Sequence, residues 1–165
     1  MTPYWTFQLR LYPWIPFLVY QAKQIRESSP KLPSQSSRLT LGQGKNHILL
    51  LGESTVAGVG ASSPGHTLAG NFNRLFGESF QIETIGKKGL RVKEALSLYL
   101  QHRQSQTPKS TGVILFLGAN DCFLLTSPVA FKKEVETLIY QIQMATSAQW
   151  VYLAAIPPVH LFPAF

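Results

Sequence analysis

The sequence has 165 residues, a length that suits one domain, and 45% of them are hydrophobic while 14% are charged. A chain of this composition can build a hydrophobic core, which argues against an intrinsically disordered protein. Its one cysteine, Cys122, excludes an intramolecular disulfide framework and a cysteine-rich zinc site.

The net charge of +7 is unevenly distributed along the chain. Residues 1–45 contain six basic residues and one acidic residue, a balance of +5, whereas residues 46–165 contain nine basic and seven acidic residues, a balance of +2. A nucleic-acid-binding face usually carries its positive charge along the folded domain, with aromatic residues interleaved. The charge distribution therefore disfavours binding to nucleic acid.

The first predicted element is an apolar and aromatic segment at residues 12–20, followed by Lys23 and Arg26. It is shorter than the roughly 20 residues that cross a bilayer. Its two prolines and the absence of a cleavage site do not fit a signal peptide, which favours a cytoplasmic or peripherally membrane-associated protein. Two interpretations stay open: a first helix that packs on the domain, or an interfacial segment in which residues 12–26 contact lipid headgroups.

Residues 28–45 are rich in Ser, Pro, Gln and Gly, which is typical of a linker. We therefore expect two parts, an N-terminal apolar and basic helix with its linker over residues 1–45 and a folded domain over residues 46–165.

Strand and helix patterns alternate along residues 46–165. Apolar runs predict four strands, at residues 47–51, 80–85, 112–117 and 150–156. Apolar residues at helical spacing predict helices over residues 68–76, 92–100 and 128–142, the last with Ser127 as its N-cap. This alternation predicts an α/β fold with a parallel sheet covered by helices on both faces.

Three glycine-containing loops follow the first three predicted strands, at residues 52–55, 86–89 and 118–122. Because the carboxyl ends of parallel strands meet at one edge of a sheet, these loops could converge on one ligand.

Ser54, in the first loop, is the candidate nucleophile. Its own N–H, the Gly89 N–H and the Asn120 side-chain amide would supply three donors for the oxyanion that forms when a serine attacks a carbonyl. Each residue also has a plain alternative. Ser54 would cap the following helix, Gly89 would permit a tight turn, and Asn120 and Asp121 would close a turn through their side chains.

The same loops resemble the three sequence blocks of the SGNH, or GDSL-type, hydrolase family. The matching segments are Leu51-Gly-Glu-Ser-Thr-Val-Ala-Gly58, Thr84-Ile-Gly-Lys-Lys-Gly-Leu90 and Leu117-Gly-Ala-Asn-Asp121. The resemblance implies a flavodoxin-like three-layer α/β/α sandwich and a serine esterase or lipase mechanism without metal or cofactor. The implied substrate is a small-molecule or lipid-like ester.

The resemblance also assigns roles to individual residues. It makes Ser54 the nucleophile, and it places Gly89 and Asn120 on the glycine and asparagine of the oxyanion hole. The supporting residues of the blocks are Gly52, Glu53, Gly118 and Asp121. Glu53 stands where the family usually has Asp, and we expect that its longer side chain still accepts hydrogen bonds from loop N–H groups.

A second departure concerns the catalytic histidine and aspartate, which the family carries in a C-terminal Asp-x-x-His block. That motif is absent from this sequence, in which Asp121 is the single aspartate. His160 is expected to line the pocket rather than to act as a base, and His47, His66 and His102 to be structural or to face water.

We therefore expect a truncated family member with four of the usual five strands. The last strand, its helix and the catalytic His and Asp would be missing, so the 165-residue chain itself would be largely inactive. The alternative is a non-catalytic, membrane-associated ligand-binding module of the same fold.

Overall fold

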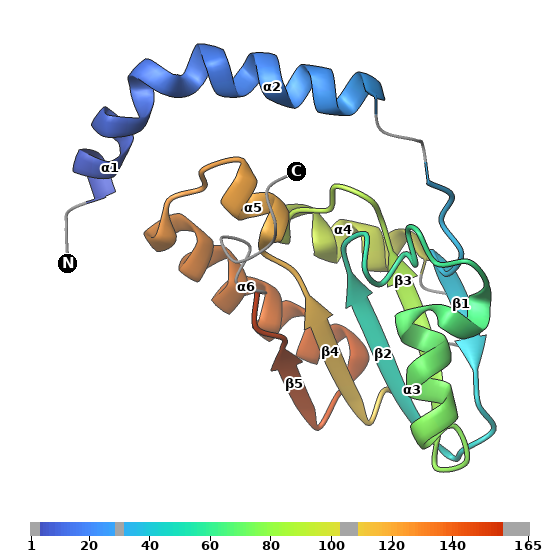
Figure 1. Cartoon of the computed structure of the whole chain (residues 1–165). Coiled ribbons are helices and arrows are strands. Elements are labelled where there is room, and N and C mark those ends of the chain that lie inside the picture. Colours follow the sequence, from blue (N-terminus) through green and yellow to red (C-terminus); the bar gives the residue numbers. More distant parts are fainter. Residues whose placement is uncertain (1–3, 29–31, 103–108, 157–165) are drawn as a thin grey trace. The chain divides into compact units, whose positions relative to one another are not determined.

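The computed structural model describes residues 4–28, 32–102 and 109–156. The chain divides into two compact units, and the described residues 4–28 and 32–156 belong to different units. Figure 1 labels the helices and strands of both units.

The first unit is helical. It consists of α1 (Tyr4–Leu11), the 3₁₀ turn η1 (Tyr12–Trp14) and α2 (Ile15–Ser28). Large apolar side chains are exposed on η1 and α2, among them Trp14 and Phe17. Within the described part of the chain, each helix is too short or too polar to cross a membrane.

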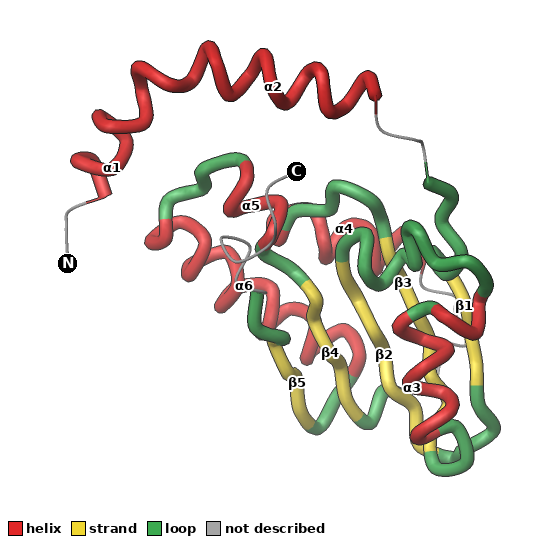
Figure 2. The backbone as a smooth tube through the Cα atoms, in the orientation of Figure 1, coloured by secondary structure: helices red, strands yellow, loops and turns green. Residues whose placement is uncertain are grey.

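The second unit is built on a five-stranded sheet with the order β1-β3-β2-β4-β5. The strands are β1 (Arg38–Leu41), β2 (Asn46–Gly52), β3 (Phe80–Gly86), β4 (Gly112–Phe116) and β5 (Trp150–Leu153). Strands β2 to β5 pair in parallel, and β1 pairs antiparallel with β3 (Figure 2). The four predicted parallel strands are confirmed, although β5 ends three residues earlier than expected.

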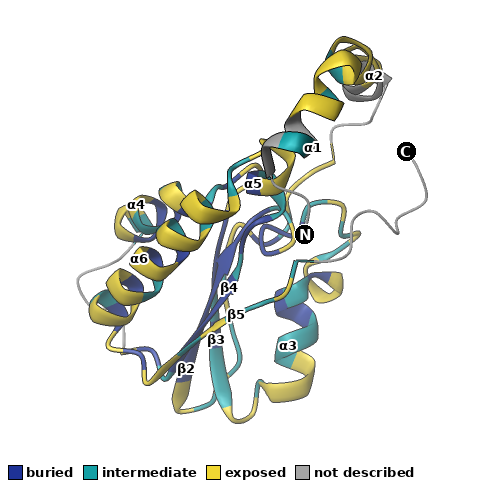
Figure 3. Cartoon of the chain, turned by 90° about the vertical axis from the view of Figure 1, so that its left-hand side faces the viewer, coloured by how far each residue is buried: buried dark blue, intermediate teal, exposed yellow. Residues whose placement is uncertain are grey.

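Helices cover both faces of this sheet, which confirms the predicted three layers. Figure 3 shows α4 (Val92–His102) and α6 (Pro128–Thr146) on one face and α3 (Leu68–Phe76) on the other. Helix α6 begins as predicted, because the Ser127 hydroxyl accepts a hydrogen bond from the Ala130 N–H at 3.2 Å. The short helix α5 (Ala119–Phe123) occupies a segment that was expected to be a loop.

The two faces of the sheet divide the core, because side chains alternate along a strand. Leu49 and Leu51 of β2 pack in the larger cluster, with residues of α4 and α6. Ile48 and Leu50 belong to the smaller cluster, against which side chains of α3 pack. Alternation between two apolar layers explains why β2 is apolar along most of its length.

The expected linker over residues 28–45 is wrong for residues 38–41, which form β1, and the sheet therefore has five strands rather than four. A buried hydroxyl helps to fix this edge strand. Thr84 of β3 is 0% exposed, and its Oγ1 accepts a hydrogen bond from the Leu39 N–H at 2.9 Å. The same hydroxyl donates to the Ser36 carbonyl at 2.8 Å.

A second buried polar network lies at the opposite end of β2 from the predicted loops. His47 is buried, with Nδ1 3.1 Å from the Ser110 hydroxyl and Nε2 3.2 Å from the Glu83 carboxylate. These contacts join the segments around β2, β3 and β4, in agreement with the structural role expected for His47.

We predict that Thr84→Val lowers the free energy of unfolding by about 1–3 kcal/mol. The substitution keeps the shape of the side chain but leaves the Leu39 N–H and the Ser36 carbonyl without this partner. Thr137→Val is the matched control, because the Thr137 hydroxyl is exposed on α6 and donates to the Lys133 carbonyl. Urea unfolding of the three proteins measures the effect, and equal losses in both variants would argue against this role for Thr84.

Candidate active site

The three predicted loops leave the sheet at one edge. In the parallel register, Gly52 at the end of β2 lies opposite Gly86 on β3 and Phe116 on β4. The segments that follow these three residues contain Ser54, Gly89 and Asn120 respectively. Figure 1 shows that β2, β3 and β4 run in the same direction, so their carboxyl ends lie at one edge of the sheet. The expected convergence of the loops is therefore a feature of the structure.

The Glu53 carboxylate connects the first of these loops to the third. Its Oε1 accepts hydrogen bonds from the Gly118 N–H at 2.5 Å and, more weakly, from the Asn120 N–H at 3.5 Å. Its Oε2 accepts a hydrogen bond from the Asn120 side-chain Nδ2 at 2.8 Å. The expectation that Glu53 accepts loop N–H groups is confirmed, and the bond to the Asn120 side chain was not foreseen.

Burial of Glu53, which is 6% exposed, raises the pKa of its carboxyl above the ordinary value. Hydrogen bonds from backbone N–H groups of residues 118–120 oppose this effect, and the nearby negative charge of Asp121 adds to it. The net direction is upward because removal of the carboxylate from water outweighs the hydrogen bonds.

Asn120 joins all three loops. Besides its bond to Glu53, its Nδ2 donates to the Leu90 carbonyl at 3.1 Å, and Leu90 directly follows Gly89. An asparagine amide has two hydrogens, so both are directed at acceptors within the protein.

Ser54 and Gly89 differ from Asn120 in this respect. Ser54 is half-buried, and neither its N–H nor its hydroxyl has a hydrogen-bond partner among the described residues. The same holds, within the described chain, for the N–H of Gly89, which is exposed in a turn with φ of +77°. A side chain at that φ would be strained, so glycine suits the position.

Asp121 anchors the third loop to α4. Its carboxylate, 1% exposed, accepts hydrogen bonds from the Val92 N–H at 3.0 Å and from Arg91 Nε at 3.3 Å. A negative charge at the N-terminus of α4 is favourable. Thr126 also bonds to this pair, with its hydroxyl 3.1 Å from Arg91 and 3.4 Å from Asp121. Asp121 therefore acts as a structural anchor, a role that its place in the sequence motif did not reveal.

Two glycines at the edge allow close packing. Gly118 has φ of +123°, and a Cβ built there would lie 2.6 Å from the Ile156 side chain. A Cβ on Gly52 would lie 2.5 Å from the Phe116 carbonyl oxygen on the neighbouring strand. Both positions require glycine, which fits their expected supporting roles.

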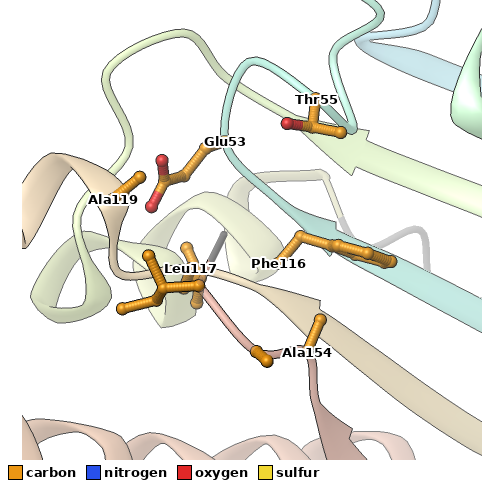
Figure 4. A pocket seen from close by; sticks show the side chains of 8 residues that line it. Glu53, Thr55, Phe116, Leu117, Ala119 and Ala154 are labelled. Atoms are coloured by element: carbon orange, nitrogen blue, oxygen red, sulfur yellow. The ribbon is translucent and has the colours of Figure 1, made fainter. Parts of the chain in front are cut away.

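Two concavities adjoin the loop at residues 53–55. The first is a pocket of about 200 Å³, shown in Figure 4, whose lining is apolar apart from Glu53 and Thr55. The other lining residues are Phe116, Leu117, Ala119, Ala154, Ala155 and Ile156. The second concavity is an open hollow of about 400 Å³ that Ser54, Thr55 and His66 line together with neighbouring loop residues.

His66 is the described histidine that shares this hollow with Ser54. Its Nδ1 lies 2.7 Å from the Ser62 hydroxyl. His102 bonds instead to the Leu98 carbonyl within α4, and His160 lies outside the described residues. No local pattern in the sequence indicated that His66 and Ser54 would line the same hollow, because the loop between them has no regular period.

A metal site is not apparent in the part of the chain that the structure describes, where no group of three or more His, Cys, Asp or Glu side chains could hold an ion. Among the described residues, the candidate site combines a serine hydroxyl, loop N–H groups, one amide and two anchored carboxylates.

Solved structures with this fold include AlinE4, an esterase of the SGNH-hydrolase family. The TM-score is 0.57 at 22% identity, and the match covers 73% of this chain and 64% of AlinE4. For TesA the TM-score is 0.55 at 18% identity, and the match covers 71% of this chain and 65% of TesA. For EstA, a psychrotrophic esterase from Pseudoalteromonas sp., the TM-score is 0.52 at 22% identity. The match covers 70% of this chain and 63% of EstA. These similarities show the fold, and the chain spans less than two thirds of each of these proteins.

No curated protein matches the sequence. Residues 50–164, more than half of the chain, match the sequence model of the GDSL-like lipase/acylhydrolase family. The matched range includes all three loops of the candidate site, as the resemblance of the sequence blocks predicted. The chain belongs to the GDSL-like lipase/acylhydrolase family.

Proposed function

We propose that the protein hydrolyses carboxylic esters with Ser54 as the nucleophile. The N–H groups of Ser54 and Gly89 and the side-chain amide of Asn120 stabilise the oxyanion. One observation carries the proposal: the Asn120 amide bonds to Glu53 beside Ser54 and to Leu90 beside Gly89, so that the three donors belong to loops in direct contact.

In the first step, Ser54 Oγ forms a bond to the ester carbonyl carbon, and the carbonyl electron pair moves to its oxygen. The bond to the alcohol oxygen then breaks, and the alcohol leaves with the proton that the serine gave up. Water attacks the acyl group on Ser54, which releases the carboxylic acid and restores the hydroxyl. These steps need neither a metal nor a cofactor.

A base must take the proton from Ser54. His66 lines the same hollow, but its Nδ1 contacts the Ser62 hydroxyl, and no carboxylate contacts His66 among the described residues. A carboxylate partner orients the imidazole and stabilises the imidazolium in a catalytic triad. Asp121 is already bound to Arg91 and Val92. We therefore expect slow acylation of Ser54, because none of the described residues gives it a histidine with a carboxylate partner.

The apolar pocket is lined by Glu53 and Thr55, the two neighbours of Ser54, and it supports an inference about the acyl group of the ester. Its volume of about 200 Å³ is below the roughly 300–1,000 Å³ of sites for drug-sized ligands. Small side chains such as Ala154 and Ala155 line it next to Phe116 and Leu117. We infer a short acyl chain as its occupant, rather than a long lipid chain.

We predict that the wild-type chain releases at least one equivalent of p-nitrophenol from p-nitrophenyl acetate, because acylation of Ser54 expels the alcohol. Ser54→Ala should remove this release and still fold. Asn120→Ala should slow it by about 10²–10³-fold, the usual effect of losing an oxyanion donor. Stopped-flow absorbance measures the release, and circular dichroism checks the fold.

Ser97→Ala is the matched control, since the Ser97 hydroxyl is exposed on α4 and bonds within its own helix. This variant should behave like the wild type. A Ser54→Ala protein that releases p-nitrophenol at the wild-type rate would refute the assignment of the nucleophile.

The first unit supports a second proposal, contact with a membrane surface through residues 12–26. Tyr12, Trp14, Phe17 and Tyr20 are exposed there, and residues 1–45 have a balance of +5. Aromatic and basic residues together suit the interface of an anionic bilayer. The same feature favours the alternative of a non-catalytic, membrane-associated ligand-binding module.

We predict that the chain co-sediments with vesicles that contain phosphatidylserine and that deletion of residues 1–27 abolishes this binding. Vesicles of phosphatidylcholine alone are the control for charge. Binding that survives the deletion would contradict the proposed contact. Vesicle binding without any acylation of Ser54 would favour the ligand-binding module.

A further inference from the structure

Glu53 is placed to control the side chain of Asn120, and this inference rests on the proposed function. We propose that Glu53 is a positioning residue for the Asn120 amide. During the reaction, the amide exchanges its hydrogen bond to the Leu90 carbonyl for one to the oxyanion, and it keeps its hydrogen bond to Glu53 throughout.

The need for an exchange follows from the number of hydrogens. An asparagine side chain has two N–H groups. In the structure, Nδ2 lies 2.8 Å from Glu53 Oε2 and 3.1 Å from the Leu90 carbonyl oxygen, so both N–H groups have acceptors. Asn120 can donate to an oxyanion only after it gives up one of these two bonds.

The bond to Leu90 is the weaker of the two. Its acceptor is a neutral carbonyl, whereas Glu53 in its ionised form offers a charged oxygen at a shorter distance. Charge-assisted hydrogen bonds are about twice as strong as neutral ones. Glu53 is also held in place by the Gly118 N–H. The amide therefore keeps Glu53 as its anchor and releases Leu90.

The position of Leu90 suits this exchange. Its carbonyl belongs to the residue that follows Gly89, whose exposed N–H has no partner among the described residues. An oxyanion held by the Gly89 N–H would therefore contact the same loop as the carbonyl that Asn120 releases. The second Asn120 N–H would need only a local change of direction.

The length of Glu53 matters for the same reason. An aspartate would place its carboxylate one carbon–carbon bond, about 1.5 Å, closer to its own backbone. The strand register, with Gly52 opposite Phe116, fixes the separation between the first and third loops. We therefore expect an aspartate to lengthen at least one of the two contacts that Glu53 makes, to the Gly118 N–H and to the Asn120 amide.

The experiment measures how fast a fluorophosphonate modifies Ser54 of the full 165-residue chain. Ser54 Oγ forms a bond to phosphorus, fluoride leaves, and the serine proton passes to the buffer. The variants are Glu53→Asp, Glu53→Gln, Asn120→Ala and the double variant Glu53→Asp/Asn120→Ala. Glu136→Asp is the matched control, because Glu136 is exposed on α6 and pairs with Lys132.

We expect Glu53→Asp to lower the maximal rate of modification at least tenfold, but by less than the roughly 10²–10³-fold that loss of a whole donor causes. The concentration of probe that gives half-maximal rate should stay within about twofold, because Glu53 acts through Asn120 and not on the probe. Glu53→Gln keeps the length but has one acceptor oxygen, so it should show a similar loss. The double variant should be no slower than Asn120→Ala alone.

Modification of both Glu53 variants at the wild-type rate would overturn the proposal. So would losses that multiply in the double variant, because Glu53 would then act independently of Asn120. If Glu53 were merely structural, its replacement would lower the unfolding temperature, and the rate losses of Glu53→Asp and Asn120→Ala would be independent.

The side-chain amide signal of Asn120 in the ¹H–¹⁵N NMR spectrum provides a second readout. It is identified by its loss in Asn120→Ala and should shift when Glu53 is replaced by Asp or Gln. A wild-type Ser54 that is not modified at all would refute the proposed function. The Asn120 signal would then test the positioning role of Glu53 separately. An unchanged signal in both Glu53 variants would refute that role. If those variants fail to fold, an Asn120 signal in the wild type that does not move during titration of Glu53 would refute it as well.

Discussion

The carboxylate of Glu53 accepts hydrogen bonds from the Gly118 N–H and from the Asn120 side chain, and the geometry of the candidate site depends on these bonds. A buried carboxylate is costly unless donors surround it. Here the donors come from the loop after β4, while the carboxylate comes from the loop after β2. Satisfying one buried charge therefore fixes the distance between two loops, and Asn120 extends the connection to the loop after β3 through the Leu90 carbonyl.

Asp121 performs a similar task one residue further along the chain. It accepts hydrogen bonds from Val92 at the start of α4 and from Arg91, so the third loop is attached to a helix as well as to Glu53. Both carboxylates near Ser54 are thus engaged with loop and helix donors. His66 contacts neither carboxylate among the described residues, and its Nδ1 lies 2.7 Å from the Ser62 hydroxyl and 3.4 Å from the Ser63 hydroxyl.

Much of the fold could be predicted from the sequence, because long apolar runs and helical periodicity are strong signals. Ser127 marked the start of α6, and the ends of the parallel strands located the three loops. The strand β1 was missed, since four residues in a Ser- and Pro-rich segment carry little local signal. Its pairing with β3 is a long-range interaction, fixed in part by the buried Thr84 hydroxyl.

The candidate site, like the fold, could be predicted from the sequence only in part. Ser54, Gly89 and Asn120 could be placed at one edge from strand ends alone, and Glu53 could be expected to accept N–H groups. The sequence could not reveal that Asn120 uses both of its amide hydrogens, or that Asp121 binds the start of α4. These facts depend on side-chain directions across different loops, which no local pattern encodes.

The most direct measurement is an NMR titration of the Gly118 amide in the 18.4 kDa protein. A 2.5 Å hydrogen bond to a carboxylate should move this amide proton far downfield. We expect it to shift in one step as the pH passes through the Glu53 pKa. The midpoint should lie above 4.5, because burial raises the Glu53 pKa, and the step should be absent from Glu53→Gln. An ordinary amide shift that does not change with pH, or the same step in Glu53→Gln, would show that Glu53 does not hold this loop.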